Sequence, residues 1–374
     1  MRIGLDARAL ASRRRSGVEH YVINLTRALA ELADAPEIIA YLDQPVTDPG
    51  LARVAASGKV RLQLMRARRG WLRAALPWRL WRDRAGLIHL PSTIVPPLLP
   101  CLAVVTAHDL AWARYPETYE SADLRMQTRV VPRSIRRAAH VIAVSQATAD
   151  DLVDLLQVPA DKITVTRLGV STVFRPDGPR IPADAFAGAE RAREGCVLHT
   201  GGLHPRKNVP RLLEAYAILR REMACPPFVI AGDAGSGSGQ QAIAKAAALG
   251  LAGDVIFPGQ LAEALLPALY RAAVVVAYPS LHEGFGLPIL EAMASGAPVV
   301  TSDRSSMKEV AGDAAVLVDP EDIQGLTEAL RRAISDEGLR EQLRQKGLAR
   351  SQEFRWERTA RETAAVYRRF ARGS

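Results

Sequence analysis

Short apolar runs alternate with longer helical patterns along the whole chain, and this alternation constrains the fold more than any other feature of the sequence. The runs are rich in β-branched residues and lie at 2–5, 87–89, 103–107, 140–144, 163–166, 197–200, 228–231, 255–257, 274–278, 298–301 and 315–318. Most are followed by a segment with the apolar period of a helix, as at 18–33, 209–221 and 287–295. Strands that are apolar throughout and alternate with helices predict parallel sheets covered on both faces.

The length and one break in the pattern predict two domains. The chain has 374 residues, whereas one core rarely grows beyond ~250–300 residues. Residues 175–195 contain three prolines and three glycines without a regular period, which is typical of an interdomain linker. We therefore predict an α/β fold with two Rossmann-like doubly wound domains, 1–175 and 190–355, facing each other across a cleft. Ligands of open α/β sheets bind at the carboxyl ends of the strands.

Charge and cysteine content exclude several classes of protein. Lys and Arg number 49 against 40 Asp and Glu, and the excess lies in residues 1–175, which hold 25 basic and 16 acidic side chains. One basic face is therefore expected, and not a coat that binds nucleic acid. Cys101, Cys196 and Cys225 are too scattered for a disulfide framework or a metal site. Charged residues near the N-terminus argue against a signal peptide, so a cytoplasmic protein is expected.

The sequence GGLHPRKN at 201–208 is the first candidate binding loop. It follows a predicted strand and precedes a predicted helix, and Gly202 lies where backbone can approach a ligand closely. The N-terminus of a helix offers unpaired N–H groups, and Arg206 and Lys207 add two charges. This combination favours a diphosphate over a merely solvated loop.

A second candidate loop, PSLHEGFGLPILEAMASG, also runs from a strand into a helix. It contains Glu283 followed by Gly284, Phe285 and Gly286, and then Glu291 on the helix. Two glutamates at this spacing are weak evidence of a hydrolytic pair. A carboxylate after a strand can instead bind sugar or ribose hydroxyls.

Two positions in the first half are also candidates. Gly17 begins a predicted helix after Arg13, Arg14 and Arg15, which suits either an anion site or a simple helix cap. His108 follows a predicted strand directly; a histidine there can move a proton, although a lone histidine at a strand end is more often structural. The histidines form no pair with metal-ligand spacing, so no metal site is expected.

The window 61–84 holds eight Arg and one Asp, interleaved with Trp71, Trp78 and Trp81. Such a segment suits contact with an anionic membrane. It also suits stacking on single-stranded nucleic acid, or an exposed face whose tryptophans pack inward; of these, nucleic acid is disfavoured.

Nearly the whole chain carries segments typical of one enzyme family: RIGLDAR, SGVEHYVINL, THDLAW with YPETY, VIAVSQATADDL, ITVTRLGV, PRKN, and HEGFGLPILEAMASGAPVV with VAGDAAVLVDP. These segments resemble the retaining glycosyltransferases of family 4, which have the GT-B fold. Members of that family usually need no metal. Many of them have two adjacent glycines in the first loop, where this chain has Ser16 and Gly17.

The resemblance implies roles for the candidate residues. Arg206 and Lys207 would grip the donor diphosphate, and Glu291 would bind the ribose hydroxyls. Glu283, with backbone groups of Gly284 and Phe285, would hold the transferred sugar. The remaining matches are Gly17 at the first glycine-rich loop, His108 near the reacting sugar, and 356–374 as a C-terminal helix that packs back on the first domain.

The resemblance therefore implies a hexosyltransferase that moves a hexose, with mannose as the candidate, from a nucleotide diphosphate-sugar. The acceptor would be a saccharide or a lipid-linked glycan of the cell envelope or of an exopolysaccharide, with contact through 61–84 to the inner membrane face. No cofactor is expected beyond the donor substrate. A non-catalytic nucleotide-sugar-binding protein and a GT-B-fold epimerase or hydrolase remain as alternatives.

Overall fold

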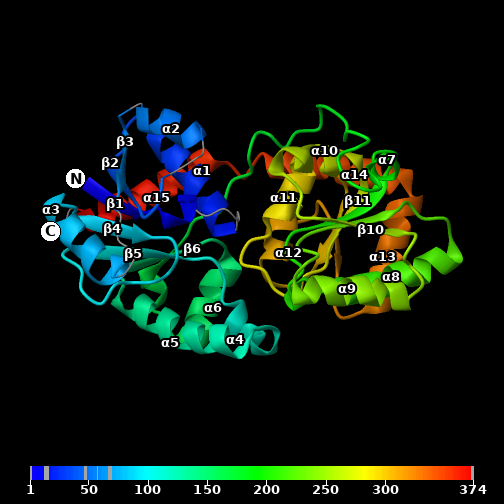
Figure 1. The fold of residues 1–374 in the computed structure, drawn as a ribbon, viewed down its shortest axis with the longest axis horizontal. Coiled ribbons are helices and arrows are strands. Elements are labelled where there is room, and N and C mark those ends of the chain that lie inside the picture. The colour runs from blue at the N-terminus through cyan, green and yellow to red at the C-terminus, as the bar shows by residue number, and fades with distance from the viewer. Residues whose placement is uncertain (1, 12–16, 46–48, 57, 66–69, 372–374) are drawn as a thin grey trace. The chain divides into compact units, whose positions relative to one another are not determined.

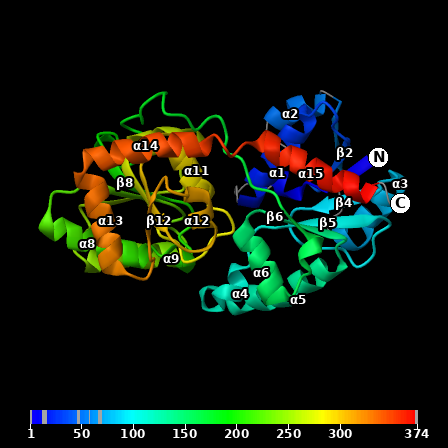
Figure 2. The same ribbon diagram turned by 180° about the vertical axis from the view of Figure 1, so that it is seen from behind.

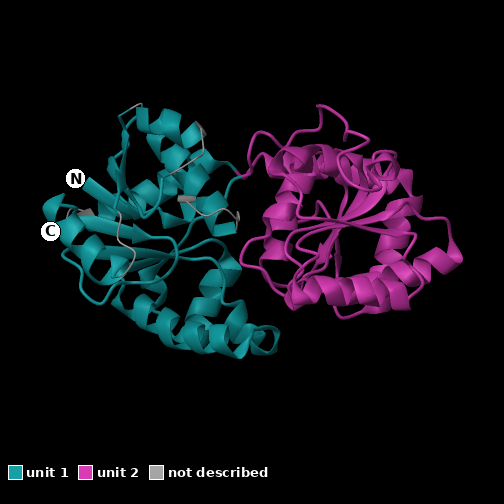
Figure 3. Cartoon of the chain, in the orientation of Figure 1, with its two compact units in different colours: residues 1–169, 355–374 teal, residues 170–354 magenta. Residues whose placement is uncertain are grey.

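The computed structural model describes residues 2–11, 17–45, 49–56, 58–65 and 70–371. The chain forms two compact units (Figure 3). Unit 1 comprises Met1–Gly169 and Arg355–Ser374, and unit 2 comprises Val170–Phe354. In each unit a parallel sheet lies between helices on both of its faces (Figures 1 and 2).

The sheet of unit 1 has the order β3-β2-β1-β4-β5-β6-β7 in the described residues, and each pair of neighbours is parallel. Its strands are β1 (Arg2–Asp6), β2 (Glu37–Leu42), β3 (Val60–Leu64), β4 (Leu87–Leu90), β5 (Leu102–Ala107), β6 (His140–Ala143) and β7 (Ile163–Val165). Its helices are α1 (Gly17–Glu31), α2 (Pro49–Ala56), α3 (Leu76–Arg82), α4 (Ala111–Arg114), α5 (Ser121–Arg137), α6 (Gln146–Leu156) and α15 (Trp356–Ala371), with short turns η1 (Arg8–Ala11), η2 (Trp71–Ala75), η3 (Pro116–Thr118) and η4 (Ala160–Lys162).

Unit 2 repeats this plan with the strand order β10-β9-β8-β11-β12-β13, again parallel throughout. Its strands are β8 (Cys196–Thr200), β9 (Phe228–Ala231), β10 (Val255–Gly259), β11 (Ala273–Tyr278), β12 (Val299–Ser302) and β13 (Val316–Val318). Its helices are α7 (Ala189–Ala192), α8 (Val209–Glu222), α9 (Gly237–Ala248), α10 (Leu266–Ala272), α11 (Leu287–Ala294), α12 (Ser305–Ala311), α13 (Ile323–Ser335) and α14 (Glu337–Ser351), with turns η5 (Pro205–Lys207) and η6 (Glu263–Leu265).

The predicted α/β class and the two doubly wound sheets are confirmed, and every strand expected from the sequence is present. Two further strands, β2 and β3, were not expected. β3 is an edge strand with the sequence VRLQL, whose polar residues interrupt the apolar run used to recognise the other strands. An edge strand with one neighbour tolerates this exposure, whereas a central parallel strand does not.

The passage between the units lies at Gly169 and Val170, before the segment 175–195 in which a linker is expected. That segment packs on unit 2: Ile181, Ala189 and Ala192 are buried, and Arg271 donates a hydrogen bond of 2.6 Å to the carbonyl of Pro179. The backbone around its prolines and glycines is irregular, but the segment is packed against unit 2.

The C-terminal helix α15 belongs to unit 1 and lies along α1 (Figures 1 and 2). Ala360, Ala364 and Tyr367 form its buried face. α15 packs on unit 1 because the apolar stripe along this helix must be covered by another surface.

Candidate active site

The two predicted donor loops lie at the carboxyl edge of the unit 2 sheet. β8 and β11 are parallel neighbours at the point where the strand order reverses, so the loops that follow them flank the topological switch point. The first loop leads through Asn208, in the left-handed region with φ 63°, into α8. The second leads through Gly286, with φ 101°, into α11. The two candidate loops recognised separately in the sequence thus share one edge of the sheet.

Glu283 joins these loops through two cations. Its carboxylate lies 2.7 Å from Nη1 of Arg206 and 2.6 Å from Nζ of Lys207. Lys207 also donates to the Tyr278 hydroxyl, which in turn donates a 3.1 Å bond to Glu283. All four side chains are largely or fully buried. The sequence suggested Arg206, Lys207 and Glu283 for related roles, and the structure places them in direct contact.

The ion cluster changes the proton affinity of its members. Burial opposes the ionisation of Glu283, but the charges of Arg206 and Lys207 outweigh it and hold the pKa of Glu283 well below its usual range. Burial and the nearby Glu283 charge raise the pKa of Tyr278 well above its usual value. At neutral pH the cluster therefore contains two cations, one carboxylate and a neutral tyrosine, with one positive charge in excess.

Asn208 and two serines hold the loops in place. The Asn208 amide donates to the carbonyl oxygens of Pro279 at 3.1 Å and Pro320 at 2.6 Å. The Ser305 and Ser306 hydroxyls both donate to the Glu283 carbonyl, at 2.7 and 2.8 Å. These residues were not expected from the sequence. An asparagine directly before a helix is a recognisable signal of a left-handed backbone. The two serines follow a different strand, and nothing in their local sequence indicates a contact with Glu283.

Glu291 lies in a second polar group of the same unit. Its Oε2 accepts a 2.9 Å bond from Tyr270, whose hydroxyl is 2.8 Å from Oγ1 of Thr200 at the end of β8. Burial raises the pKa of Glu291 to about 7, with a further contribution from Glu263, against the effect of the Tyr270 bond. Glu291 is thus poised between its two protonation states near neutral pH, whereas Glu283 is ionised.

The glycines and Phe285 of the two loops differ in backbone conformation and in packing. Gly201 and Gly286 have positive φ angles, which favour glycine, whereas Gly202 does not and has open space beside its Cα. Phe285 is buried and its ring packs edge-on against Phe354 at 6.0 Å, so only its backbone is suited to contact a ligand. Gly284 lies between Glu283 and this anchored ring.

In unit 1, His108 lies after β5 at the carboxyl edge of the sheet. Its Nε2 is 3.1 Å from the carbonyl oxygen of Pro91. Because a carbonyl only accepts, Nε2 carries the proton and Nδ1 carries the lone pair. Burial lowers the pKa of His108 to about 4, against the opposing charge of Asp109. His108 is therefore a neutral base or hydrogen-bond acceptor.

A buried hydrogen-bonded chain backs His108. The ring of Tyr21 meets the His108 ring edge-on at 5.0 Å, and the Tyr21 hydroxyl is 3.0 Å from Oγ1 of Thr106. Thr106 is 2.7 Å from Nε2 of His89, whose Nδ1 is 2.7 Å from the hydroxyl of Tyr367 on α15. The C-terminal helix is thereby bonded to the wall behind His108.

The other first-half predictions have different outcomes. Gly17 is the first residue of α1 and is exposed, while Arg13, Arg14, Arg15 and Ser16 lie outside the described residues. In the window 61–84, Trp71 is buried, whereas Trp78 and Trp81 are 54% and 69% exposed. Arg66, Arg68 and Arg69 also lie outside the described residues.

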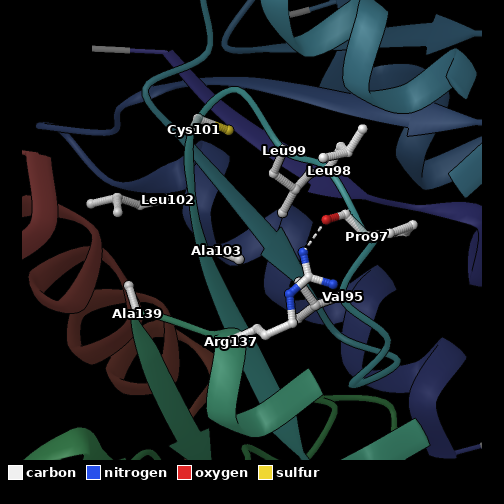
Figure 4. A pocket seen from close by; sticks show the side chains of 9 residues that line it. All are labelled: Val95, Pro97, Leu98, Leu99, Cys101, Leu102, Ala103, Arg137 and Ala139. Atoms are coloured by element: carbon white, nitrogen blue, oxygen red, sulfur yellow. Dashed lines mark hydrogen bonds between the residues drawn. The ribbon is translucent and has the colours of Figure 1, made fainter. Parts of the chain in front are cut away.

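A separate hollow of about 380 Å³ lies at the amino ends of β5 and β6, opposite the edge that carries His108. It is lined mainly by apolar side chains, and Arg137 donates to the carbonyl of Pro97 on one wall (Figure 4). None of the predicted site residues lines it. Across the described ranges, no helix is long and apolar enough to cross a membrane, and no three His, Cys, Asp or Glu side chains are grouped to hold a metal.

Comparison with models of known protein families identifies the class of protein to which the chain belongs. The model described as "Glycosyl transferases group 1" matches residues 181–350, and "Glycosyltransferase Family 4" matches residues 15–174. The chain belongs to the family 4 glycosyltransferases. It is therefore an enzyme of sugar transfer, and the resemblance inferred from its motifs is confirmed.

Individual relatives agree with this assignment. O-antigen chain mannosyltransferase B of Escherichia coli is 29% identical over 94% of this chain and 96% of its own length. Serotype-specific mannosyltransferase WbdA of Escherichia coli is 31% identical over 60% of this chain, but the match spans only 28% of WbdA. A D-inositol 3-phosphate glycosyltransferase of Salinispora arenicola is 33% identical over 79% of this chain and 66% of its own length.

Solved structures support the fold. Sucrose-phosphate synthase from Thermosynechococcus elongatus covers the whole chain with a TM-score of 0.78 at 22% identity, and the whole of that chain is matched. Alr3699/HepE from Anabaena, solved in complex with UDP-glucose, matches 98% of both chains with a TM-score of 0.72 at 22% identity. The enzyme has the two Rossmann-like domains of the GT-B fold.

Proposed function

We propose that the enzyme is a retaining mannosyltransferase that moves mannose from a nucleotide diphosphate-sugar to a saccharide or lipid-linked acceptor in cell-envelope or exopolysaccharide synthesis. The buried cluster of Arg206, Lys207 and Glu283 at the unit 2 switch point carries the proposal. The choice of mannose follows the names of the E. coli relatives, and the nucleotide diphosphate follows the UDP-glucose bound to the Anabaena protein.

The reaction breaks the bond between the sugar C1 and a phosphate oxygen, so negative charge grows on the diphosphate. Arg206 and Lys207 oppose that charge, together with the N-terminal end of α8. Their positions are fixed before the donor binds because Glu283 and Tyr278 already hold them. We assign the neutralising charge to these two protein cations and expect no metal requirement.

The remaining site residues receive the other parts of the substrates. Glu291 accepts hydrogen bonds from the ribose hydroxyls, and Gly202 leaves room for close approach of the nucleotide. Glu283 and the backbone of Gly284, Phe285 and Gly286 hold the hexose. The acceptor hydroxyl attacks C1 on the face that the diphosphate leaves, and the hydroxyl proton passes to the departing phosphate oxygen.

In unit 1, His108 contacts the reacting sugar through Nδ1, the ring nitrogen that carries the lone pair. Gly17 supplies the close approach at the first loop. The neutral state of His108 matters here because an imidazolium would add positive charge beside the carbon that is itself becoming positive.

Replacing the cations tests the diphosphate role. Arg206→Ala and Lys207→Ala should each lower turnover at least 100-fold, equivalent to about 3–4 kcal/mol of transition-state stabilisation. Arg220→Ala is a matched control because Arg220 also pairs with a carboxylate, that of Asp254 at 2.8 Å, on the same unit. Near-normal turnover in both site variants, with folded protein by thermal melting, would reject the assignment.

A donor panel tests the sugar and the base. Thermal shift with GDP-mannose, UDP-glucose, UDP-galactose and dTDP-glucose should show the largest stabilisation for GDP-mannose, since a ligand at 100 times its Kd adds about 2.7 kcal/mol. Product analysis by mass spectrometry and NMR then distinguishes transfer with retention from epimerisation or hydrolysis. A larger shift with another donor would correct the sugar while leaving the transferase assignment intact.

We also propose peripheral contact with the inner membrane face through 61–84. The exposed Trp78 and Trp81, with Arg82 stacked on Trp78 at 5.4 Å, support this proposal. Replacing both tryptophans with Ser should abolish co-flotation with vesicles that contain phosphatidylglycerol. Unchanged flotation of that variant would refute it.

A further inference from the structure

Ligands of open parallel sheets bind where the strand order reverses. This rule marks a candidate site in unit 1 as well as the proposed donor loops of unit 2. There the strand order reverses between β1 and β4, so the chain after each of these strands lies at the switch point. β1 ends at Asp6, and Arg8 follows two residues later in η1. β4 ends at Leu90, and Thr93 follows with a φ of 58°. A positive φ is rare for a β-branched residue, and such strain is concentrated at binding and catalytic sites.

Arg8 is held on two sides at this edge. Its Nε and Nη2 donate to the two carboxylate oxygens of Asp6, at 2.9 and 2.7 Å. Its guanidinium carbon lies 4.4 Å from the ring centroid of Trp71. Nη1 has no hydrogen-bond acceptor among the residues that the structure describes, and the Arg8 side chain is 26% exposed. The fork is thus oriented, with one edge available for a ligand.

Trp71 provides a second, independent observation. Its side chain is buried, yet its indole Nε1 finds no hydrogen-bond acceptor within the described part of the chain. Buried donors are nearly always paired, so an unpaired one beside an oriented guanidinium points to a ligand atom. Asp6 and Arg8 are two residues apart, so their ion pair joins no distant parts of the fold.

The chemistry of the groups selects the ligand. Nη1 of Arg8 and Nε1 of Trp71 are donors, so the ligand must present acceptor oxygens. The Asp6 carboxylate neutralises the Arg8 charge and would repel a phosphate or carboxylate nearby. Neutral hydroxyl and ring oxygens of a sugar satisfy both conditions.

We infer that Arg8 and Trp71 form a binding subsite for oxygen atoms of the acceptor sugar, with Asp6 as the residue that positions Arg8. This inference rests on the proposed transferase function. It goes further in naming which residues of unit 1 recognise the acceptor and in predicting a neutral sugar at this subsite.

Steady-state kinetics with separate variation of donor and acceptor test the inference. Wild-type enzyme is first assayed with its preferred donor and with octyl α-mannoside, α-mannobiose and chitobiose as acceptors. Arg8→Lys keeps the charge but removes the fork, and Trp71→Phe keeps the ring but removes the donor. Each should raise the KM for the best acceptor at least tenfold, while the donor KM and the Kd of the nucleoside diphosphate change less than twofold.

Arg2→Lys is the matched control. Arg2 lies at the opposite end of the same strand and also pairs with a carboxylate, that of Glu37 at 3.0 Å. It should leave the acceptor KM unchanged. An acceptor KM within twofold of wild type in both Arg8→Lys and Trp71→Phe, with unchanged melting temperatures, would overturn the inference.

Different results would reject the proposed function and the subsite. If wild-type enzyme releases no nucleoside diphosphate and forms no product with any donor or acceptor of the panels, the proposed function fails before any variant is compared. If transfer occurs and the acceptor KM does not respond to Arg8 or Trp71, only the subsite assignment is wrong.

Discussion

At the scale of single residues, the proposed donor site is an electrostatic balance centred on Glu283. One buried carboxylate holds two cations, and the pair of cations retains a net positive charge. A buried ion cluster is costly to break because removing one partner leaves the others unpaired. The same arrangement prepares Arg206 and Lys207 to meet an anion without moving far.

Glu283→Gln tests this balance. The variant should lose about 3 kcal/mol of unfolding free energy because it leaves two buried cations without their carboxylate. It should also bind nucleoside diphosphate about tenfold more tightly, since Glu283 no longer repels the phosphates, while sugar transfer falls at least 100-fold. Calorimetric titration and chemical denaturation measure these effects.

Glu321→Gln is the control for that variant. Glu321 also lies between two arginines, Arg304 at 2.6 Å and Arg211 at 3.8 Å, but it is half exposed. An exposed pair contributes about 0–1 kcal/mol, so this variant should be nearly silent. Unchanged nucleotide affinity in Glu283→Gln would mean that the charge of the Glu283 carboxylate does not act on the diphosphate.

Glu291 predicts a pH effect with a definite sign. Its pKa is raised to about 7 in the folded enzyme, from 4.5 for an ordinary glutamate. The folded state therefore holds a proton that the unfolded state has released between these values, and stability falls as the pH rises from about 4.5 to 7. The loss is on the order of 2 kcal/mol, allowing for partial exposure of the side chain.

Glu291→Gln should remove that part of the pH dependence. Its unfolding free energy, measured by urea denaturation at several pH values, should vary less than that of wild type over this interval. In wild type, nucleotide affinity should rise over the upper part of the same interval, because in the proposed site the ribose hydroxyls donate to the carboxylate form of Glu291. Identical pH profiles for the two proteins would contradict the raised pKa.

At the scale of elements, the junction between η5 and α8 positions the cations. Asn208 has a left-handed backbone and its amide joins the carbonyl oxygens of Pro279 and Pro320. Arg206 and Lys207 immediately precede this brace, and the Leu281 amide bonds to the carbonyl of Arg206 at 2.8 Å. The backbone geometry of this loop therefore determines where the Arg206 and Lys207 side chains begin.

Two substitutions separate the contributions of Asn208. Asn208→Gly keeps the left-handed conformation but loses both amide bonds, and should cost about 2 kcal/mol. Asn208→Ala also adds the left-handed penalty of about 1 kcal/mol. Both should weaken nucleoside diphosphate binding at least fivefold. Equal stability of Gly and Ala variants in denaturant titrations would contradict the role of the backbone conformation.

The sequence predicted elements better than it predicted their mutual contacts. The alternation of apolar runs located the central strands because buried parallel strands need apolar residues on both faces. The edge strand β3 escaped because it is partly exposed. Glycines and charged residues marked both proposed donor loops, but Tyr278, Tyr270 and Ser306 were missed. Their side chains reach the site from a strand and from other helices, and only the fold brings them there.

At the scale of the whole molecule, unit 2 is continuous in sequence and unit 1 is not. Unit 2 contains Arg206, Lys207, Glu283 and Glu291 within Val170–Phe354. Unit 1 is completed by Arg355–Ser374, and α15 supplies Tyr367 to the chain behind His108. The two units therefore differ in what each needs in order to fold.

Fragments test this difference. Residues 170–354 alone should fold cooperatively and bind nucleoside diphosphate within about fivefold of the full enzyme, because their core and donor loops are self-contained. Residues 1–169 alone should lack a cooperative melting transition, since removal of α15 leaves the buried His89 and the face of α1 uncovered.

A fusion of residues 1–169 to 355–374 provides the rescue. Gly169 packs directly against the backbone of Trp356, so a short Gly-Ser joint spans the gap. Cooperative melting of this fusion, measured by circular dichroism, is the expected result. An isolated 1–169 fragment that melts as cooperatively as the fusion would show that α15 is dispensable.

The discontinuity of unit 1 also fixes the order of events during synthesis. The ribosome produces residues 1–169 of unit 1 first, then all of unit 2, and only then the helix that covers α1. Until α15 emerges, the nascent first half carries an uncovered apolar surface that chaperones can engage. A premature stop codon after residue 354 would therefore leave unit 2 intact and remove the helix that completes unit 1.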